Sequence, residues 1–294
     1  MATNEKIGLK PFRYYDFWAE HPNFKEVVLE NWYRPMKREG MTALYLKLMR
    51  LKYTIKRFNR ERIGDVGKKY QEAKEHYLET RMQAQEHTHD LSYQQAEKEA
   101  AMNFNAEEKM YHNFLRQMSK VTWLCKGDEN NAYFHAFLKK RRMESSIVTY
   151  TNEQGEIIDD FNEVVKHFIQ HFQGYMGTSS ITTQSLRTDC MELGNKLNLE
   201  QQLILIKPFT NKEIKKTFFR IPDSKSPGPD GYGAGFFKTM WPELGAEFTK
   251  AVENFFKTGS MPQDFHATMI TLVPKTETPT KAVNFRPIAY CSTV

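Results

Sequence analysis

Lys and Arg side chains gather at the start of this chain, where they could bind phosphate groups. The chain has 294 residues and a formal net charge of +6. Residues 1–62 hold 14 Lys or Arg against 7 Asp or Glu, and residues 208–294 hold 11 against 8. A concentrated basic stretch is the usual electrostatic footprint of a protein that binds nucleic acid or an acidic surface. The alternative is that these cations lie on a solvated helix face and bind no ligand, and both interpretations remain.

Part of this charge surrounds one apolar helical seam. The seam residues recur at alternating spacings of four and three: Leu44, Leu48, Leu51, Ile55 and Phe58. The cations around them are Lys47, Arg50, Lys52, Lys56, Arg57, Arg60 and Arg62. This period predicts an amphipathic helix whose seam packs against a core. The cations either bind RNA or stay in solvent.

A second basic run ends another predicted helix. Lys139, Lys140, Arg141 and Arg142 close a helix for which Asp128 is a suitable N-cap. Cations at a helix C-terminus complement its dipole. Arg141 and Arg142 could equally follow an RNA backbone, so both interpretations remain.

The acidic and histidine side chains do not predict a metal site. Template-directed nucleotide transfer needs paired carboxylates that hold two Mg²⁺ ions. Asp159-Asp160 and Glu107-Glu108 are adjacent pairs, and neighbours on a helix point apart. Both pairs therefore fit caps or surface positions. His87 and His89 lack a Cys or carboxylate partner at ligand spacing, so we expect them on the surface.

The cysteines and the lengths of the apolar runs indicate in which cellular compartment the protein resides. Cys125, Cys190 and Cys291 lack metal-ligand spacing, and an odd number argues against a disulfide framework. The start of the chain lacks a signal-peptide apolar region, and no run reaches the ~18 apolar residues of a membrane span. We expect an intracellular protein, nuclear or cytoplasmic, with no membrane partner.

Periodicity predicts an α+β fold with a mostly helical N-terminal half. Residues 11–35 are aromatic-rich and too broken by proline for one helix, and we expect them to pack against later parts of the chain or a missing domain. Residues 41–120 predict two or three long helices in an antiparallel hairpin. Residues 147–158 predict a β-hairpin and residues 161–172 an amphipathic helix, with Asp160 as its cap.

The C-terminal third begins after a stretch at 173–195 that is typical of a flexible linker. Thr210 and Glu213 form a capping box that opens a short helix. After a Pro-Gly loop, residues 237–255 predict a helical face, which Pro242 kinks or divides and Gly259 closes. Two strands follow, at 267–274 and 284–291.

Short motifs occur along the chain in a specific order. They are Pro11-Phe12-Arg13 with Phe17-Trp18, His21-Pro22-Asn23-Phe24, Trp123 with Gly127-Asp128-Glu129-Asn130, Phe134-His135, Lys225-Ser226-Pro227-Gly228-Pro229-Asp230-Gly231, Leu272-Val273-Pro274-Lys275 and Phe285-Arg286-Pro287-Ile288-Ala289. In this order they resemble the reverse transcriptases of non-LTR (LINE-type) retrotransposons, especially those of plants. Each motif alone is weakly specific, and their order is highly specific. Ser226 stands where the family has Ala, and Asn131 where it has Thr.

The resemblance implies an organisation in three parts. Residues 1–120 would be the linker region between endonuclease and polymerase, with a basic face. Residues 121–207 would be the N-terminal extension of the polymerase, and residues 208–294 an incomplete fingers subdomain. The chain would end before the palm.

The resemblance also implies a nucleic-acid and nucleotide-binding set. Lys275 and Arg286 would contact the triphosphate or the template backbone, Arg as a bidentate group and Lys as a point charge. The loop of Lys225, Ser226, Pro227, Gly228, Pro229, Asp230 and Gly231 would lie beside the template. For the loop, a plain structural turn is an equal alternative.

The resemblance implies that this chain binds nucleic acid but does not catalyse polymerisation. The family's catalytic carboxylates come from palm motifs that do not occur here, so we expect no catalytic residue, no bound cofactor and no polymerisation by this chain alone. Mg²⁺ is expected only for the full-length parent polymerase. The expected partners are an RNA template or RNA/DNA hybrid, together with the missing palm and endonuclease parts.

Two other interpretations compete with this one. The chain could be a non-enzymatic protein derived from a retroelement, whose helices bind RNA or a partner. It could also be an unstable remnant with no role, because incomplete fingers would leave an apolar face exposed.

Overall fold

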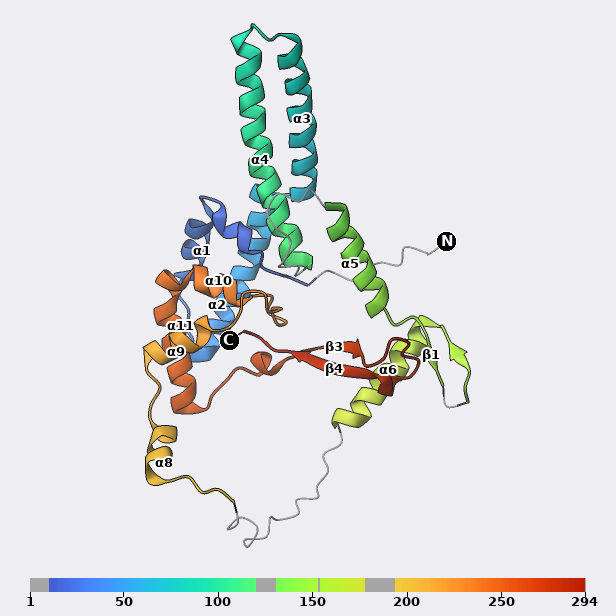
Figure 1. The fold of residues 1–294 in the computed structure, drawn as a ribbon. Coiled ribbons are helices and arrows are strands. Elements are labelled where there is room, and N and C mark those ends of the chain that lie inside the picture. Colours follow the sequence, from blue (N-terminus) through green and yellow to red (C-terminus); the bar gives the residue numbers. More distant parts are fainter. Residues whose placement is uncertain (1–10, 120–130, 153, 178–193, 294) are drawn as a thin grey trace. The chain divides into compact units, whose positions relative to one another are not determined.

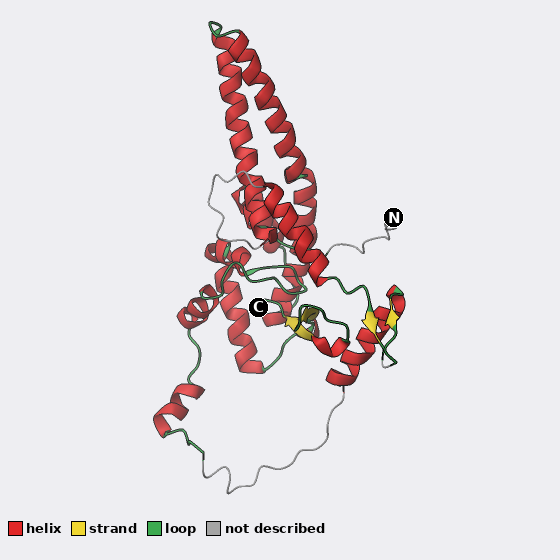
Figure 2. Ribbon diagram, turned by 45° about the vertical axis from the view of Figure 1, so that its right-hand side comes forward, coloured by secondary structure: helices red, strands yellow, loops and turns green. Residues whose placement is uncertain are grey.

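The computed structural model describes residues 11–119, 131–152, 154–177 and 194–293. Within these residues the fold is α+β and mostly helical, as the sequence predicts (Figures 1 and 2). Among the described helices, none is both long and apolar enough to cross a membrane.

The chain forms two compact units. Unit 1 comprises Met1–Arg141, Ile214–Met269 and Ala289–Val294, and unit 2 comprises Arg142–Glu213 and Ile270–Ile288. These units are defined by contacts in space, so each is assembled from separate stretches of sequence. The division at 1–120, 121–207 and 208–294 describes the order of segments along the chain and stays a prediction.

Unit 1 holds most of the helices. They are a 3₁₀ turn at Asp16–Glu20, α1 (Phe24–Trp32), α2 (Gly40–Phe58), a π-helical turn at Asn59–Ile63, α3 (Val66–Glu86), α4 (Leu91–Ser119), α10 (Ala234–Thr239), α11 (Trp241–Thr258) and a 3₁₀ turn at Gln263–His266. Two more helices cross the unit boundary, α5 (Asn131–Ser145) and α9 (Asn211–Phe219).

Helix α2 is the central helix of unit 1. It packs against both α1 and α11, and its predicted seam is buried: Leu48, Leu51 and Ile55 have no measurable exposure. This confirms the packing role of the seam. Each such aliphatic side chain stabilises the fold by about 1.5–3 kcal/mol relative to an exposed position.

Helices α3 and α4 form the predicted antiparallel hairpin, which projects from the rest of unit 1 (Figure 1). The Asp65 carboxylate caps α3 by accepting the Lys68 backbone N–H at 3.0 Å. Stacked aromatic rings hold the base of the hairpin, with Tyr70 and Tyr111 centroids 4.7 Å apart. Farther out the buried side chains are small, Ala84 and Ala100, so the arms approach closely there.

Pro242 starts a new helix instead of kinking one. It lies in the first turn of α11, where a missing N–H is tolerated, and α10 ends just before it. Gly259 closes α11 at φ +65°, the left-handed conformation that favours glycine at a C-cap. Both boundaries agree with the sequence.

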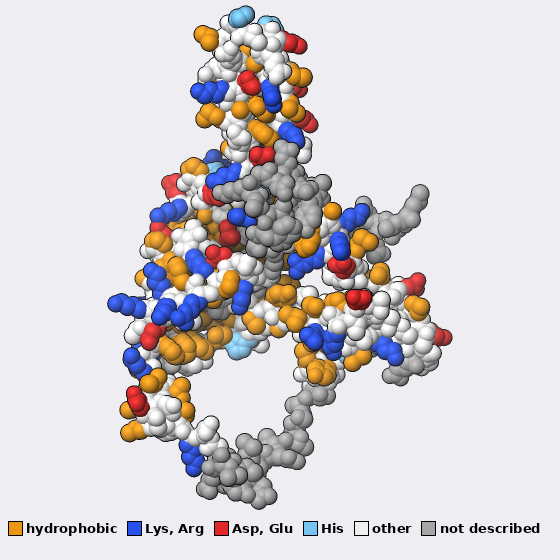
Figure 3. Space-filling view, in the orientation of Figure 1, with side chains coloured by type: hydrophobic (Ala, Val, Ile, Leu, Met, Phe, Trp, Pro, Cys, Tyr) orange, Lys and Arg blue, Asp and Glu red, His pale blue; other side chains and the backbone are white. Residues whose placement is uncertain are grey.

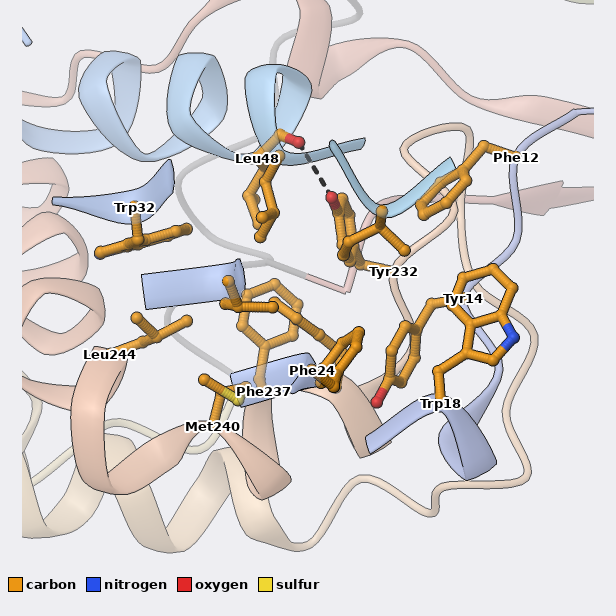
Figure 4. Close-up of a cluster of buried hydrophobic side chains, with 14 of the residues drawn as sticks. Phe12, Tyr14, Trp18, Phe24, Trp32, Leu48, Tyr232, Phe237, Met240 and Leu244 are labelled. Carbon is orange, nitrogen blue, oxygen red and sulfur yellow. Dashed lines mark hydrogen bonds between the residues drawn. The ribbon is translucent and has the colours of Figure 1, made fainter. Parts of the chain in front are cut away.

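An aromatic core joins the N-terminal segment to the region around α10 within unit 1. Tyr14, Trp18 and Phe24 come from the N-terminal segment, and Tyr232 and Phe237 from the region around α10 (Figure 4). The rings contact mainly edge to face, as at Tyr14–Phe236 with centroids 5.2 Å apart. The broken segment 11–35 therefore packs against later parts of this chain, the first of the two predicted alternatives.

Unit 2 is smaller and has its own core. Its elements are β1 (Tyr150–Thr151), β2 (Ile157–Ile158), α6 (Phe161–Gly177), α8 (Leu199–Ile206) and a 3₁₀ turn at Ala282–Asn284. Strands β3 (Met269–Pro274) and β4 (Phe285–Tyr290) pair with each other and lie mostly in this unit. Strands β1 and β2 pair antiparallel, with Tyr150 opposite Ile158, as predicted.

The core of unit 2 lies between α6 and the β3–β4 hairpin. Val164, Phe168 and Phe172 pack with Phe285 and Ala282. Asp160 accepts the Glu163 N–H at 2.9 Å, which confirms the predicted cap of α6. Phe161 and Val165, by contrast, are exposed, so the buried face of α6 is narrower than its apolar pattern.

Some predictions lie elsewhere or missed an element. Most of the stretch 173–195 and the proposed cap Asp128 lie outside the described residues. The sequence did not lead us to predict α8, although its signal was present. Asn198 and Gln201 form a capping box that opens this helix.

Substitution of Gly231 tests the contact between its loop and the N-terminal segment of unit 1. It has φ +83°, and a Cβ there would fall 2.2 Å from the Phe12 carbonyl oxygen. We expect Gly231→Ala to destabilise unit 1 by about 2–4 kcal/mol, because a strained backbone and a backbone clash add. Urea unfolding followed by tryptophan fluorescence measures this, since Trp18, Trp32 and Trp241 all lie in unit 1.

Gly233→Ala is the matched control for that variant. Gly233 has φ −86°, and a Cβ there would have no atom within 4 Å of it. It precedes the first residue of α10, where Ala replaces Gly at a cost below about 1 kcal/mol. Equal losses in the two variants would contradict this account of the contact.

Candidate nucleic-acid interface

The Ser-Pro-Gly-Pro-Asp-Gly loop lies between α9 and α10 and is held from several sides. The Tyr14 backbone N–H donates to the Gly231 carbonyl at 2.9 Å, and the Tyr232 hydroxyl donates to the Leu48 carbonyl at 3.0 Å (Figure 4). Gly228 lies against the backbone of Cys291, where a Cβ would fall 2.4 Å away. The Thr293 hydroxyl donates to the Tyr232 carbonyl at 2.8 Å. The N-terminal segment, α2 and the C-terminal residues thus fix one loop conformation.

Asp230 is the buried charge of this loop. Its side chain is 5% exposed, and its Oδ1 accepts the Tyr232 N–H at 3.4 Å. Its Oδ2 has no hydrogen-bond partner among the described residues. Burial raises the pKa of the Asp230 carboxyl from 3.8 to about 6, against the opposing effect of the backbone N–H groups and Lys52. Asp230 therefore shapes the loop from inside and is not placed to meet a ligand.

One edge of the loop faces solvent. Lys225 is exposed, and Ser226, Pro227 and Pro229 are half-buried. Gly228 and Gly231, like Asp230, are buried. Nucleic acid could contact this loop directly only at the edge that begins at Lys225. The buried residues determine the shape of the loop. Contact with a template by this loop stays a prediction.

A cavity of about 320 Å³ adjoins the loop in unit 1. Its charged lining residues are Arg13, Arg116 and Lys225 against Asp16, Glu20 and Asp223. Burial raises the pKa of the Asp16 carboxyl, and the charge of Asp223 raises it further. Since its three cations and three acids balance, this cavity does not favour an anion.

Lys275 and Arg286 lie on the β3–β4 hairpin, which the structure confirms as a paired unit (Figure 1). The Lys275 ammonium donates to the Val283 carbonyl at 2.8 Å, and its backbone N–H donates to the Asn284 carbonyl at 2.8 Å. Lys275 therefore helps to close the connection between the strands. Arg286 is exposed, while its neighbour Phe285 faces the core of unit 2.

Arg286 has the greater freedom of the two cations. The structure gives its guanidinium no hydrogen bond or ion pair with any described residue. Successive strand residues point to opposite faces, so the burial of Phe285 fixes Arg286 outward. A planar guanidinium held this way can take two phosphate oxygens at once.

The predicted set falls into three groups. The loop belongs to unit 1, and Lys275 and Arg286 belong to unit 2. Arg141 and Arg142 are exposed near the end of α5, where they complement its dipole, and the unit boundary falls between them. A common site for the three groups stays a prediction.

The cations around α2 divide into those that contact the fold and those that are exposed. Lys47 pairs with Glu247, and Arg50 donates to the carbonyls of Asn31 and Arg34 at the end of α1. The Lys52 ammonium lies 5.6 Å from the centroid of the Phe12 ring, and burial lowers its pKa. These three cations serve the fold. Sequence alone could not separate them from the exposed ones: Lys56, Arg57, Arg60 and Arg62.

Further cations gather over α9 and α11 on the face seen in Figure 3. Lys215, Lys216 and Arg220, on or just after α9, are exposed, and Lys238 of α10 pairs with Asp223 at 2.8 Å. The sequence had indicated only the charge surplus of residues 208–294. This surface adjoins the stretch that leads to Lys225.

No cluster of three or more His, Cys, Asp or Glu side chains in the described part of the chain could hold a metal ion. Asp159 and Asp160 are exposed, and Asp160 caps α6. Glu107 and Glu108 lie in α4. His87 and His89 are exposed, as expected, and the His87 ring stacks on Tyr93 with centroids 4.4 Å apart.

The raised pKa of Asp230 gives a pH test of the loop. The folded protein binds this proton more tightly than the unfolded chain, so the contribution of Asp230 to stability falls as pH rises from about 4 to about 6. We expect the stability of wild type relative to Asp230→Asn to drop by about 2–3 kcal/mol across that window and then to level. Urea unfolding of both proteins between pH 4 and pH 8, in steps, measures this difference. Parallel pH profiles would contradict it.

Comparison with known proteins gives a distant similarity. No protein-family model matches it. Over 178 residues it is 26% identical to the "Transposon TX1 uncharacterized 149 kDa protein" of Xenopus laevis. The match covers 60% of this chain and 13% of that protein, so the chain spans a small part of the relative. This distant similarity supports an origin of the chain in a transposable element.

Proposed function

We propose that this chain is a piece of a retrotransposon RNA-directed DNA polymerase of the non-LTR type, which grips nucleic-acid phosphate. In this proposal it supplies no catalytic carboxylate of its own. The ordered motifs from Pro11 to Ala289 support the polymerase assignment, and the similarity to a transposon protein supports the origin. The partner would be an RNA template or an RNA/DNA hybrid.

The observation that carries the proposal is the placement of Arg286. Its strand neighbour Phe285 is anchored by Phe168, with ring centroids 5.3 Å apart. The anchor leaves the guanidinium exposed on a two-stranded platform, unpaired among the described residues. Such a group loses little conformational freedom when it meets a phosphate, because its strand is already fixed.

Lys225 and Lys275 would support this grip in different ways. Lys225 extends from the edge of a rigid loop, so its charge is presented at a fixed place on unit 1. Lys275 holds the Val283 carbonyl, and its remaining N–H donors stay directed to the outside. We expect Lys275 to contribute more to the shape of the hairpin than to affinity.

A non-enzymatic role in binding RNA is the second candidate. The exposed cations at the end of α2 favour it, since they belong to neither the loop nor the hairpin. The two candidates differ in which cations carry affinity, so substitutions of single cations separate them.

We expect Arg286→Ala to weaken binding to a single-stranded RNA about tenfold and to lower the log–log salt slope by about 0.7, because one phosphate contact is lost. Lys225→Ala should show a smaller effect of the same kind. Fluorescence anisotropy over a series of salt concentrations measures both quantities.

Lys166→Ala is the matched control for Arg286→Ala. Lys166 is an exposed cation on α6 in the same unit, and it lies outside the predicted binding set. The proposal fails if Lys166→Ala and Arg286→Ala change affinity and salt slope equally. It fails as well if neither Arg286→Ala nor Lys225→Ala changes them.

A further inference from the structure

The outer face of α2 carries an aromatic ring where an amphipathic helix usually carries polar groups. Tyr53 lies on the side opposite the buried seam of Leu48, Leu51 and Ile55. Its side chain is 74% exposed. It makes no aromatic or cation contact with any residue that the structure describes. The ring is therefore accessible to another flat group.

Three cations follow this ring along the chain. Lys56 and Arg57 come three and four residues after Tyr53 on α2 and share its face, and Arg60 lies in the turn that follows the helix. All three cations are exposed. We call this set the Tyr53 surface. Arg60 also contacts Glu61 at 3.4 Å, an exposed ion pair and so a weak interaction.

A wide turn follows the end of α2 and carries two of the exposed cations. The Gly64 N–H donates to the Asn59 carbonyl at 2.7 Å, five residues back, which makes a π-helical turn. Phe58 and Ile63 are both buried, so the turn is anchored at each end. Arg60 and Arg62 lie in this turn and are exposed. Turns closed by such a bond are common at helix C-termini, and Gly64, at φ +72°, ends this one.

The position of these cations is not accounted for by packing. Lys47, Arg50 and Lys52, earlier on the same helix, all contact groups of unit 1. Lys56 and Arg57 complement the dipole at the end of α2. The dipole does not explain the exposed ring of Tyr53.

We propose that the Tyr53 surface binds single-stranded nucleic acid, with an unpaired base stacked on the Tyr53 ring and flanking phosphates on Lys56, Arg57 and Arg60. An exposed ring beside cations is the arrangement that holds single strands, because bases stack on aromatic faces while the cations follow the backbone. Paired bases in a duplex already stack on each other and cannot reach the ring. This surface uses residues of neither the loop nor the β3–β4 hairpin, so it stands without the polymerase assignment.

The test measures binding of the whole chain to labelled oligonucleotides of about ten nucleotides: single-stranded oligo(U), single-stranded oligo(dT) and a duplex of equal length. We expect Tyr53→Ala to weaken binding of the single strands about tenfold and to leave duplex affinity unchanged. Tyr53→Phe should keep the wild-type affinity, because the ring remains. The Lys56→Gln and Arg57→Gln changes should lower the salt slope for every nucleic acid.

Tyr175→Ala is the matched control, since Tyr175 is 77% exposed on α6 in unit 2. We expect it to leave every affinity unchanged. The proposal is overturned if Tyr53→Ala has no effect on single strands, if it weakens duplex binding equally, or if polyglutamate competes as well as oligo(U). A comparison of oligo(U) with oligo(dT) shows which single strand the surface prefers.

These outcomes are independent of those for Arg286 and Lys225. If the variants of the loop and hairpin have no effect while Tyr53→Ala does, the polymerase grip fails and the Tyr53 surface stands. The reverse pattern overturns the Tyr53 surface and leaves the grip.

Discussion

The contact between the N-terminal segment and the Asp230 loop is the constraint on which unit 1 depends. Tyr14 donates to the Gly231 carbonyl, and Phe12 lies where any side chain at position 231 would have to be. The Tyr232 hydroxyl then ties the same loop to the Leu48 carbonyl of α2. Through these bonds the first and last parts of the chain share one aromatic core. Removing either part would expose the rings of the other to water, at a cost of several kcal/mol.

This constraint decides which polar groups remain for a ligand. Asp230 and the glycines beside it are occupied by the fold, and so are Lys47, Arg50 and Lys52 on α2. The exposed cations lie at the margins: at Lys225, on the β3–β4 hairpin and beyond the seam of α2. Unfavourable burial of the Asp230 carboxylate is tolerated because the surrounding rings and backbone bonds hold the loop regardless. Nucleic acid would therefore bind the exposed cations on the surface of each unit and not its cavities.

The sequence predicted local structure well and distant contacts poorly. The seam of α2, the capping residues Asp160 and Thr210, and the stop at Gly259 are local signals that were confirmed. Two kinds of feature escaped. The partner of the aromatic segment and that of Lys47 lie about 200 positions away, and Arg50 and Lys52 contact the N-terminal segment, which periodicity cannot relate to them. The π-helical turn and α8 also escaped, because Gly64 marks only the end of α2, and because the Asn198 cap opens a short helix whose apolar residues all remain exposed.

The central claim is that nucleic acid meets the cations that the fold leaves exposed. Chemical modification of Lys and Arg, read by mass spectrometry with and without single-stranded RNA, tests it most directly. The account predicts protection at Lys56, Arg57, Lys225 and Arg286, with no change at Lys68 or Lys166, which are exposed cations outside these surfaces. Equal protection at Lys68 and Lys166, or no protection at any of the four, would contradict it.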